Sequence, residues 1–238
     1  MMIKTKAVVL AVIKYNDNDV IVKAFTEETG FTAYYIKGLL KNKKGKLKKA
    51  FFQPNALLHL VATHKNKGQL EYIKEASPYY HYKTINIDFD KLTISTFIRE
   101  ILLESLKNEQ ADTQLYNFIE KQFIQLDQQD YNANSHLHFL IELTAFLGFK
   151  PQTDYSGDYF DMESAVFTNK LPLGVFLNKP ETLLLNRLLG MVFATNSSQK
   201  LSNSERRKGI EIMLKYYQLH IERFIMPKSL SILSQIYQ

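Results

Sequence analysis

The spacing of hydrophobic and polar residues divides the chain into two parts. Up to about Ala76, short runs rich in Val, Ile, Phe and Tyr are separated by turn-forming residues, a pattern that is typical of β-strands. The turn-forming residues include Asn16 to Asp19 and the Thr29-Gly30 pair. Five strands are predicted, over residues 3–15, 20–26, 31–37, 56–64 and 70–76.

One of the connections between these five strands is long and runs from residue 37 to residue 56, between the third and fourth strands. Five strands in so short a stretch suit a small closed or partly closed barrel of the oligonucleotide-binding (OB) type. An SH3-like barrel or a short β-sandwich gives the same pattern, and periodicity alone does not exclude either.

From about residue 90 the apolar spacing changes to that of amphipathic helices. We expect Ser135 to cap the third helix and Gly148 to end it. Helices are predicted over residues 90–106, from 112, over 135–147, from 180 to about 194, from Ser202 or Ser204 to 224, and from 229. Between residues 150 and 178 the helical spacing fails, and short β-like pieces occur at 159–161 and 165–168.

The sequence therefore predicts an α+β protein of two domains. Residues 1–79 form a five-stranded OB-fold β-barrel that binds nucleic acid, and residues 80–238 form a helical domain. The segment at about 150–178 is a small insertion in the helical domain, partly irregular and partly a β-hairpin.

Positive charge is concentrated at the N-terminal end of the chain. The formal net charge is +6, yet the first fifty residues contain eleven lysines against four acidic residues. The remainder has one more acidic than basic residue. Such segregation of charge favours a polyanion as the partner.

Much of this charge lies in one segment, Lys37 to Asn55, which contains no acidic residue. Its lysines are Lys37, Lys41, Lys43, Lys44, Lys46, Lys48 and Lys49, and Phe51-Phe52 follows them. Ammonium groups beside aromatic rings suit a phosphate backbone with stacked bases, so we predict that these residues bind DNA. Because lysine lacks the guanidinium fork that reads base edges, binding is expected to be largely independent of sequence. The alternative is a solvated loop whose charge only increases solubility.

Aromatic residues are a second set of candidates. In a strand, neighbouring side chains point to opposite faces, so we expect one ring of each adjacent pair to fill the barrel. The other ring would be available for stacking on bases. The candidates are Tyr34, Tyr35, Phe51, Phe52, Tyr79, Tyr80 and Tyr82.

A second basic cluster lies at the start of the long penultimate helix. It comprises Arg206, Arg207, Lys208 and Lys215. We predict a second DNA contact here, or a site for an acidic protein tail, with ordinary surface charge as the alternative.

No catalytic motif is found in the sequence. Cysteine is absent, which excludes disulfides, thiol nucleophiles and cysteine-ligated zinc, and there is no HExxH, Gly-rich phosphate loop or GxSxG. Four acidic residues could be drawn as the metal site of a nuclease, although a surface hairpin with scattered acids is the commoner explanation for them: Asp154, Asp158, Asp161 and Glu163. We therefore expect no enzyme, no cofactor and no metal.

The start of the chain has no signal-peptide cleavage site, and no apolar run approaches the roughly 20 residues that span a bilayer. These features predict a cytoplasmic protein without membrane contact.

Four stretches of the sequence resemble the bacterial DNA repair and recombination mediator family RecO. They are TKAVVLAVIKYNDNDVIVKAFTEETGFTAYYIKGLLKNKKGKL from residue 5, AFFQPNALLHLV from 50, LIELTAFLGFKPQ from 140 and YYQLHIERFIMPKSL from 216. Their order and spacing cover essentially the whole chain.

This resemblance implies an OB barrel followed by a helical domain. It also implies binding of single- and double-stranded DNA, annealing of complementary strands, and assistance in loading recombinase onto DNA coated by single-strand-binding protein (SSB). The implied partners are RecR and the acidic C-terminal tail of SSB. An RNA-binding or translation-associated OB module is the alternative function, and a metal-dependent nuclease a less favoured one.

The chain departs from the family pattern at one place. Many relatives carry a four-cysteine zinc element where this sequence has DYSGDYFDMESAVF, from residue 154. Without thiolates a structural zinc is not expected, and we predict that aromatic residues stabilise the element instead: Tyr155, Tyr159, Phe160 and Phe167.

Overall fold

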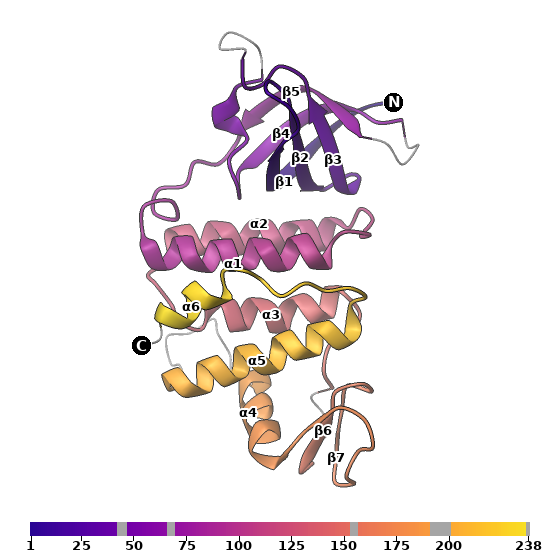
Figure 1. Ribbon diagram of the computed structural model, residues 1–238, viewed down its shortest axis with the longest axis vertical. Helices are drawn as coiled ribbons and strands as arrows, with labels where there is room; N and C mark the ends of the chain where they lie inside the picture. The colour runs from indigo at the N-terminus through magenta and orange to yellow at the C-terminus, as the bar shows by residue number, and fades with distance from the viewer. Residues whose placement is uncertain (42–46, 66–69, 153–156, 191–200, 237–238) are drawn as a thin grey trace. The chain divides into compact units, whose positions relative to one another are not determined.

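The computed structural model describes residues 1–41, 47–65, 70–152, 157–190 and 201–236, which belong to two compact units (Figure 1). The first unit is Met1–Asp130 and the second is Tyr131–Gln238. The predicted boundary at residue 79 therefore lies inside the first unit, which contains the barrel and two helices. Within the described ranges, no helix is both long and apolar enough to cross a membrane.

The N-terminal strands form a closed barrel. They are β1 (Met2–Lys14), β2 (Val20–Thr26), β3 (Gly30–Ile36), β4 (Leu57–Thr63) and β5 (Glu71–Pro78). Their order is β1-β2-β3-β5-β4, and the barrel closes because β1 also pairs with β4. Only the short β3–β5 pairing is parallel. The predicted five-stranded barrel is thus confirmed, and closure of the sheet excludes the β-sandwich.

The barrel interior is filled by alternating strand residues. On β2, for example, Val20, Val22 and Ala24 are almost fully buried while Ile21 and Lys23 between them are partly exposed. This alternation follows from the period of two along a strand. The pairing register of β1 shifts between Val9 and Ala11 where it runs beside β2, a bulge of the kind that bends long strands around small barrels.

Two helices complete the first unit. They are α1 (Phe89–Ser105) and α2 (Thr113–Gln128), and each begins at an aspartate whose carboxylate accepts backbone N–H groups, Asp88 and Asp112 respectively. The Phe31 N–H donates to the Glu109 carbonyl, 3.1 Å away, beside Gly30. A side chain at Gly30 would meet that carbonyl at 2.4 Å, and its φ of +68° also favours glycine.

The connection between β5 and α1 is fixed by the carboxylate of Asp127. This buried group accepts the backbone N–H groups of Lys83, Thr84 and Ile85 and the hydroxyl of Tyr80. A buried carboxylate is stable only when its oxygens are so paired. These bonds attach the first residues after the barrel to the end of α2.

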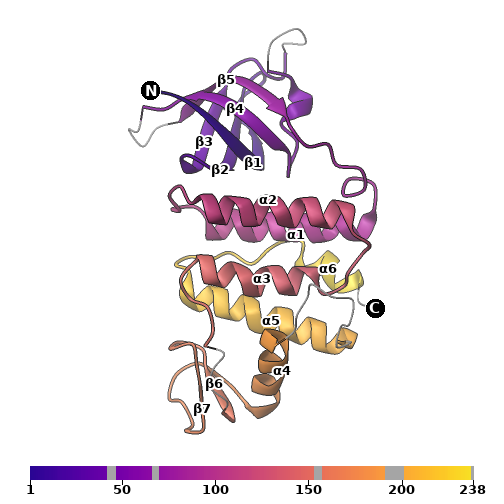
Figure 2. The same ribbon diagram turned by 180° about the vertical axis from the view of Figure 1, so that it is seen from behind.

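The second unit consists of helices and one small sheet. The helices are α3 (Ser135–Phe146), α4 (Lys179–Gly190), α5 (Asn203–His220) and α6 (Leu230–Ile236). Figure 2 shows α3 and α5 side by side, and they pack against each other. Gly148 takes a φ of +80° just after α3, as the prediction of a helix terminator requires.

Several predicted boundaries differ from the structure. The cap residue of α3 is Asn134, and Ser135 is the first helical residue. The helix α5 ends at His220 rather than at residue 224, whereas its N-cap is Ser202, one of the two expected residues. The predicted extension of α4 to residue 194 lies outside the described residues.

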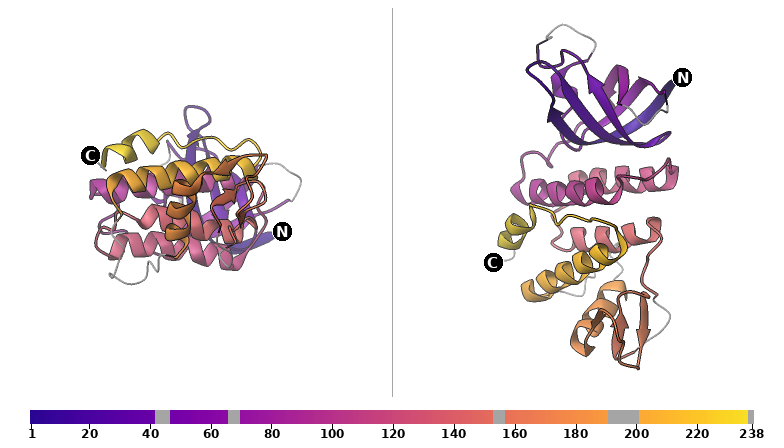
Figure 3. Two further views of the ribbon diagram at one scale, coloured as in Figure 1. Left: turned by 90° about the horizontal axis from the view of Figure 1, so that it is seen from below. Right: turned by 45° about the vertical axis from the view of Figure 1, so that its right-hand side comes forward.

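The small sheet is the predicted insertion with one further strand. Its strands are β6 (Tyr159–Asp161), β7 (Val166–Thr168) and β8 (Phe176–Leu177), in the order β7-β6-β8, and α4 lies beside them (Figure 3). Phe160 is fully buried, with its ring centroid 4.9 Å from that of Phe167 and 5.9 Å from that of Tyr216 on α5. Aromatic packing therefore stabilises the insertion at Phe160 and Phe167, two of the four predicted positions. Tyr155 lies outside the described residues.

Candidate nucleic-acid interface

The apolar residues of the lysine segment, residues 37–49, and the two phenylalanines after it pack against the barrel. Leu39 and Phe52 are 4% and 3% exposed and belong to the barrel core, while Leu40, Leu47 and Phe51 pack partly buried against it. Phe52 therefore fills the barrel and offers no surface to a base. Phe51, the other member of the pair, keeps part of its ring exposed.

The described lysines of the same segment face solvent. Lys37, Lys41, Lys48 and Lys49 are exposed, and no ion pair joins any of them to a carboxylate of a described residue. The Lys48 ammonium lies 5.7 Å from the centroid of the Phe51 ring. Four exposed ammonium groups of like sign that form no close ion pair with a described residue attract an external anion. Lys43, Lys44 and Lys46 lie outside the described residues.

The start of the lysine segment is fixed by a buried carboxylate, that of Asp19. It accepts the Tyr35 hydroxyl, the Gly38 N–H at 2.7 Å and the Asn16 amide at 2.7 Å. The hydrogen bond from Tyr35 is the main reason that the pKa of Asp19 is lowered. In return, this bond to the carboxylate raises the pKa of Tyr35 to about 12. Asp19 thus connects the β1–β2 turn, strand β3 and the lysine segment.

A groove of about 530 Å³ lies next to this point on the barrel surface. We call it the tyrosine groove, and its lining residues are Tyr35, Ile36, Lys37, Leu47, Thr63, Lys65, Tyr72, Ile73 and Lys74. It brings together the end of β3, the lysine segment and both sides of the β4–β5 connection. Three of the lining residues are lysines and none is acidic, so the groove favours an anionic ligand.

Three aromatic rings form a row beside the groove. The Tyr35 ring lies edge to face with Tyr15, at a centroid distance of 5.7 Å, and with Tyr72, at 6.0 Å. Tyr15 is 62% exposed and Tyr72 is 44% exposed. Tyr35 is held by Asp19, so the central ring has a fixed position and the two outer rings are accessible.

The other aromatic candidates have structural roles. Tyr34 is fully buried, and its hydroxyl lies 3.1 Å from Nε2 of His64. The Tyr79 hydroxyl donates to Glu120, the Tyr80 hydroxyl to Asp127, and the Tyr82 hydroxyl to the Asn55 carbonyl. These bonds fix the chain between β5 and α1.

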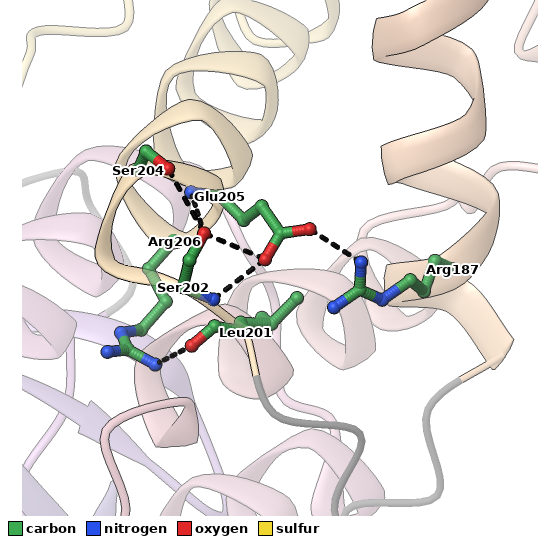
Figure 4. Close-up of polar contacts among 6 residues, drawn as sticks. All are labelled: Arg187, Leu201, Ser202, Ser204, Glu205 and Arg206. Carbon is green, nitrogen blue, oxygen red and sulfur yellow. Dashed lines mark hydrogen bonds and ion pairs between the residues drawn. The ribbon is translucent and has the colours of Figure 1, made fainter.

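At the start of α5, two of the predicted basic residues contact groups of the protein itself, and Figure 4 shows one of these contacts, from Arg206 to Leu201. Arg206 donates to the Leu201 carbonyl at 2.6 Å and to the Asn203 side chain. Lys208 forms an ion pair with Glu181 of α4 at 2.7 Å. Arg207 and Lys215 are exposed.

An acid stabilises the same helix start. Glu205 and the N-cap Ser202 form a reciprocal capping box, and the Glu205 carboxylate lies 2.5 Å from Nη1 of Arg187 on α4. The Ser202 N–H, its hydroxyl and the Arg187 guanidinium lower the pKa of Glu205 to about 2. These contacts connect α4 to α5.

The acidic residues of the insertion are engaged in its fold. Asp158 pairs with Lys179 at 2.9 Å, and the Asp161 carboxylate accepts the N–H groups of Glu163 and Ser164 in a turn. Asp154 lies outside the described residues. In the part of the chain that the structure describes, no three potential ligands come together as a metal site.

Sequence reasoning missed Tyr15, Lys65, Tyr72 and Lys74 as candidate binding residues. A signal was present for two of them, because Tyr72 and Lys74 are two apart on a strand and point outward on either side of buried Ile73. Their proximity to Tyr35 depends on the β3–β5 pairing that closes the barrel. Lys65 is placed by its backbone N–H, which donates to the buried Glu71 carboxylate at 2.8 Å.

Comparisons with known proteins cover the whole chain. Residues 1–82 match the family model "Recombination protein O N terminal" and residues 87–230 match "Recombination protein O C terminal". Three similar proteins, each named DNA repair protein RecO, are 35% identical in Christiangramia forsetii, 36% in Flavobacterium psychrophilum and 37% in Azobacteroides pseudotrichonymphae. In each case the match covers 100% of both chains.

Proposed function

The chain belongs to the RecO family of DNA repair proteins, and from this premise we propose that it is a non-enzymatic mediator that binds single- and double-stranded DNA through the lysine segment. The observation that supports this most is the exposure of Lys37, Lys41, Lys48 and Lys49 without a carboxylate partner among the described residues. Leucines and phenylalanines attach the same segment to the barrel, so the charge is presented from a fixed surface.

Strand annealing follows from charge neutralisation. Two complementary strands repel each other through their phosphates, and an array of ammonium groups reduces that repulsion so that the strands approach and pair. Lysine contacts phosphate as a point charge and does not read base edges, so strands of any sequence are accepted. No covalent step is needed.

In a cell the proposed role is assistance in loading recombinase onto SSB-coated DNA. The partners proposed from the family are RecR and the acidic C-terminal tail of SSB. Pull-down of the full chain with RecR, and separately with a peptide of the SSB tail, tests these partners. A scrambled peptide of the same charge is the control for the tail.

Reversal of charge in the lysine segment tests the main proposal. Replacing Lys37, Lys41, Lys48 and Lys49 with glutamate should abolish binding of single- and double-stranded DNA in fluorescence anisotropy, and annealing with it. Because all four side chains are exposed, the far-UV circular dichroism should stay unchanged. Annealing that survives this change at wild-type rate contradicts the proposal.

A further inference from the structure

The tyrosine groove has the features of a subsite for unpaired nucleotides. We propose that a single DNA strand lies in this groove, with one base stacked on Tyr72, a second on Tyr15, and phosphates next to Lys37, Lys65 and Lys74. This inference rests on the proposed function, because it names how the same barrel would distinguish single strands from duplex.

The accessible rings give the first argument. Tyr72 and Tyr15 expose 44% and 62% of their surface and flank Tyr35, whose hydroxyl is bonded to Asp19. Each outer ring is nearly perpendicular to Tyr35, so each is in contact with a held ring while a large part of its surface stays exposed. Rigid, partly exposed aromatic rings are the usual platforms for bases in single-strand binding, since every base has a flat face.

The charge around the rings gives the second argument. The lining contains three lysines and no acidic residue, so the groove attracts the phosphates between successive bases. The buried Glu71 carboxylate accepts the backbone N–H of Lys65 and so places Lys65 beside the groove. The volume of about 530 Å³ lies within the range of ligand clefts, roughly 300–1,000 Å³.

The position of Lys65 could be an objection, because its ammonium lies over the Tyr72 ring. The distance to the ring centroid is 5.9 Å, at the outer limit for a cation–π contact. At an exposed site such a contact is weaker than the stacking of a base on a ring. A base can therefore displace the flexible lysine, which then remains close enough to reach the adjacent phosphate.

Duplex DNA cannot use these rings, because its bases are already stacked on one another. It can still contact the lysines. The two rings should therefore contribute to the affinity for single strands and not to the affinity for duplex.

The test combines a tyrosine variant with a strand that lacks bases. Tyr72→Ala should weaken binding of a fluorescein-labelled oligo(dT) by about 5- to 150-fold, since stacking is worth roughly 1–3 kcal/mol per base and 1.4 kcal/mol is tenfold. Binding of a strand of abasic residues of the same length, and of duplex, should not change. Tyr72→Phe, which keeps the ring, should bind as the wild type does, and Tyr15→Ala provides a second variant at an exposed turn.

A fluorescence measurement checks stacking directly. The chain contains no tryptophan, so Tyr72→Trp introduces a single reporter. We expect its emission to be quenched by oligo(dT) and not by the abasic strand. Equal quenching by both strands, or no quenching at saturation, contradicts stacking.

The outcomes separate this inference from the proposed function. If the lysine variants lose all DNA binding while Tyr72→Ala binds oligo(dT) normally, the proposed function stands and the groove inference is wrong. If Tyr72→Ala weakens oligo(dT) alone while glutamate at Lys41, Lys48 and Lys49, the described lysines outside the groove lining, leaves binding normal, the groove stands and the role of the lysine segment is wrong. Equal weakening for all three nucleic acids would assign the effect of Tyr72→Ala to folding and would contradict stacking. If an RNA strand of the same sequence bound more tightly than the DNA strand and its binding depended on Tyr72, the ligand of the groove would be RNA and not DNA.

Discussion

The lysine segment and the start of α5 are both rich in basic residues, yet their charges differ in what surrounds them. In the lysine segment the four described lysines are exposed and have no carboxylate partner among the described residues. At the start of α5, Lys208 pairs with Glu181. There Arg206 donates to a backbone carbonyl, and Glu205 pairs with Arg187.

The difference shows that the number of basic residues does not measure the charge that is available to a ligand. The lysine segment contains no acid, whereas Glu205 and Glu211 lie within α5 itself and Glu181 reaches it from α4. In the first region the charges repel one another and favour an external anion. In the second they stabilise the packing of two helices.

Neutralising equal numbers of charges in the two regions should give the largest contrast. Replacing Lys37, Lys41, Lys48 and Lys49 with glutamine should weaken single-strand binding by roughly 100-fold at 0.15 M salt and reduce the slope of log K against log[salt] by about 2.8. The matched variant replaces Arg206, Arg207, Lys208 and Lys215 with glutamine and should bind within about twofold of the wild type. Anisotropy titrations at several salt concentrations measure both. If the matched variant lost more DNA affinity than the lysine-segment variant, the start of α5 and not the lysine segment would be the main DNA contact.

Loss of the Glu205 carboxylate should lower stability and leave DNA binding unchanged. Glu205→Ala removes half of the capping box and the contact with Arg187, so the free energy of unfolding should fall by about 1–2 kcal/mol. Urea denaturation followed by circular dichroism measures this. Glu211→Ala is the matched control, because Glu211 is exposed and lies 3.9 Å from its partner Lys208. The interpretation of this helix start is wrong if both variants lose the same stability.

The elements of the barrel could be predicted from the sequence because their signals are local. Strand β2, for example, was predicted with its observed limits, since its apolar residues lie between two groups of turn-forming residues. Closure of the barrel is not a local property. It depends on the pairing of Tyr34 and Tyr35 with Glu71 and Tyr72, far apart in sequence, and the tyrosine groove exists only after that pairing.

One error of prediction arises because apolar residues continue after the regular element has ended. Phe224 continues the apolar pattern of α5, but the helix ends at His220, and the Phe224 ring centroid lies 5.6 Å from that of Tyr217. For the pair Phe51 and Phe52, the expectation that one ring fills the barrel agrees with the burial of Phe52. Which of the two is buried could not be predicted, because the pair lies at a short 3₁₀ turn, Lys49–Phe51, where the alternation of strand faces does not apply.

Release of Lys208 from its ion pair should have a small effect that sharpens the comparison. Glu181→Gln removes the contact at 2.7 Å between the carboxylate and the ammonium, a partly exposed pair that contributes less than about 1 kcal/mol. We expect DNA affinity to stay within twofold, because we propose that the contacts with phosphate are made by the barrel. An increase in affinity together with a steeper salt dependence would indicate that pairing with Glu181 masks a second DNA contact.

The smallest expected effect is the pH dependence of the Glu205 contribution. Glutamine at this position can keep the geometry of the capping box, so Glu205→Gln removes the charge that strengthens the hydrogen bonds from Ser202 and pairs with Arg187. The pKa of Glu205 is lowered from 4.5 to about 2, so the ionised carboxylate stabilises the folded state fully above about pH 4.5. That stability is lost as the pH falls towards 2. Urea denaturation of the wild type and of Glu205→Gln should therefore show a constant difference in the free energy of unfolding between pH 5 and 8. The difference should be less than about 1 kcal/mol, because the pair is partly exposed, and it should shrink below pH 4.5. A difference that grows on acidification would mean that the protonated acid is the stabilising form, and the ion pair would then not be what connects α5 to α4.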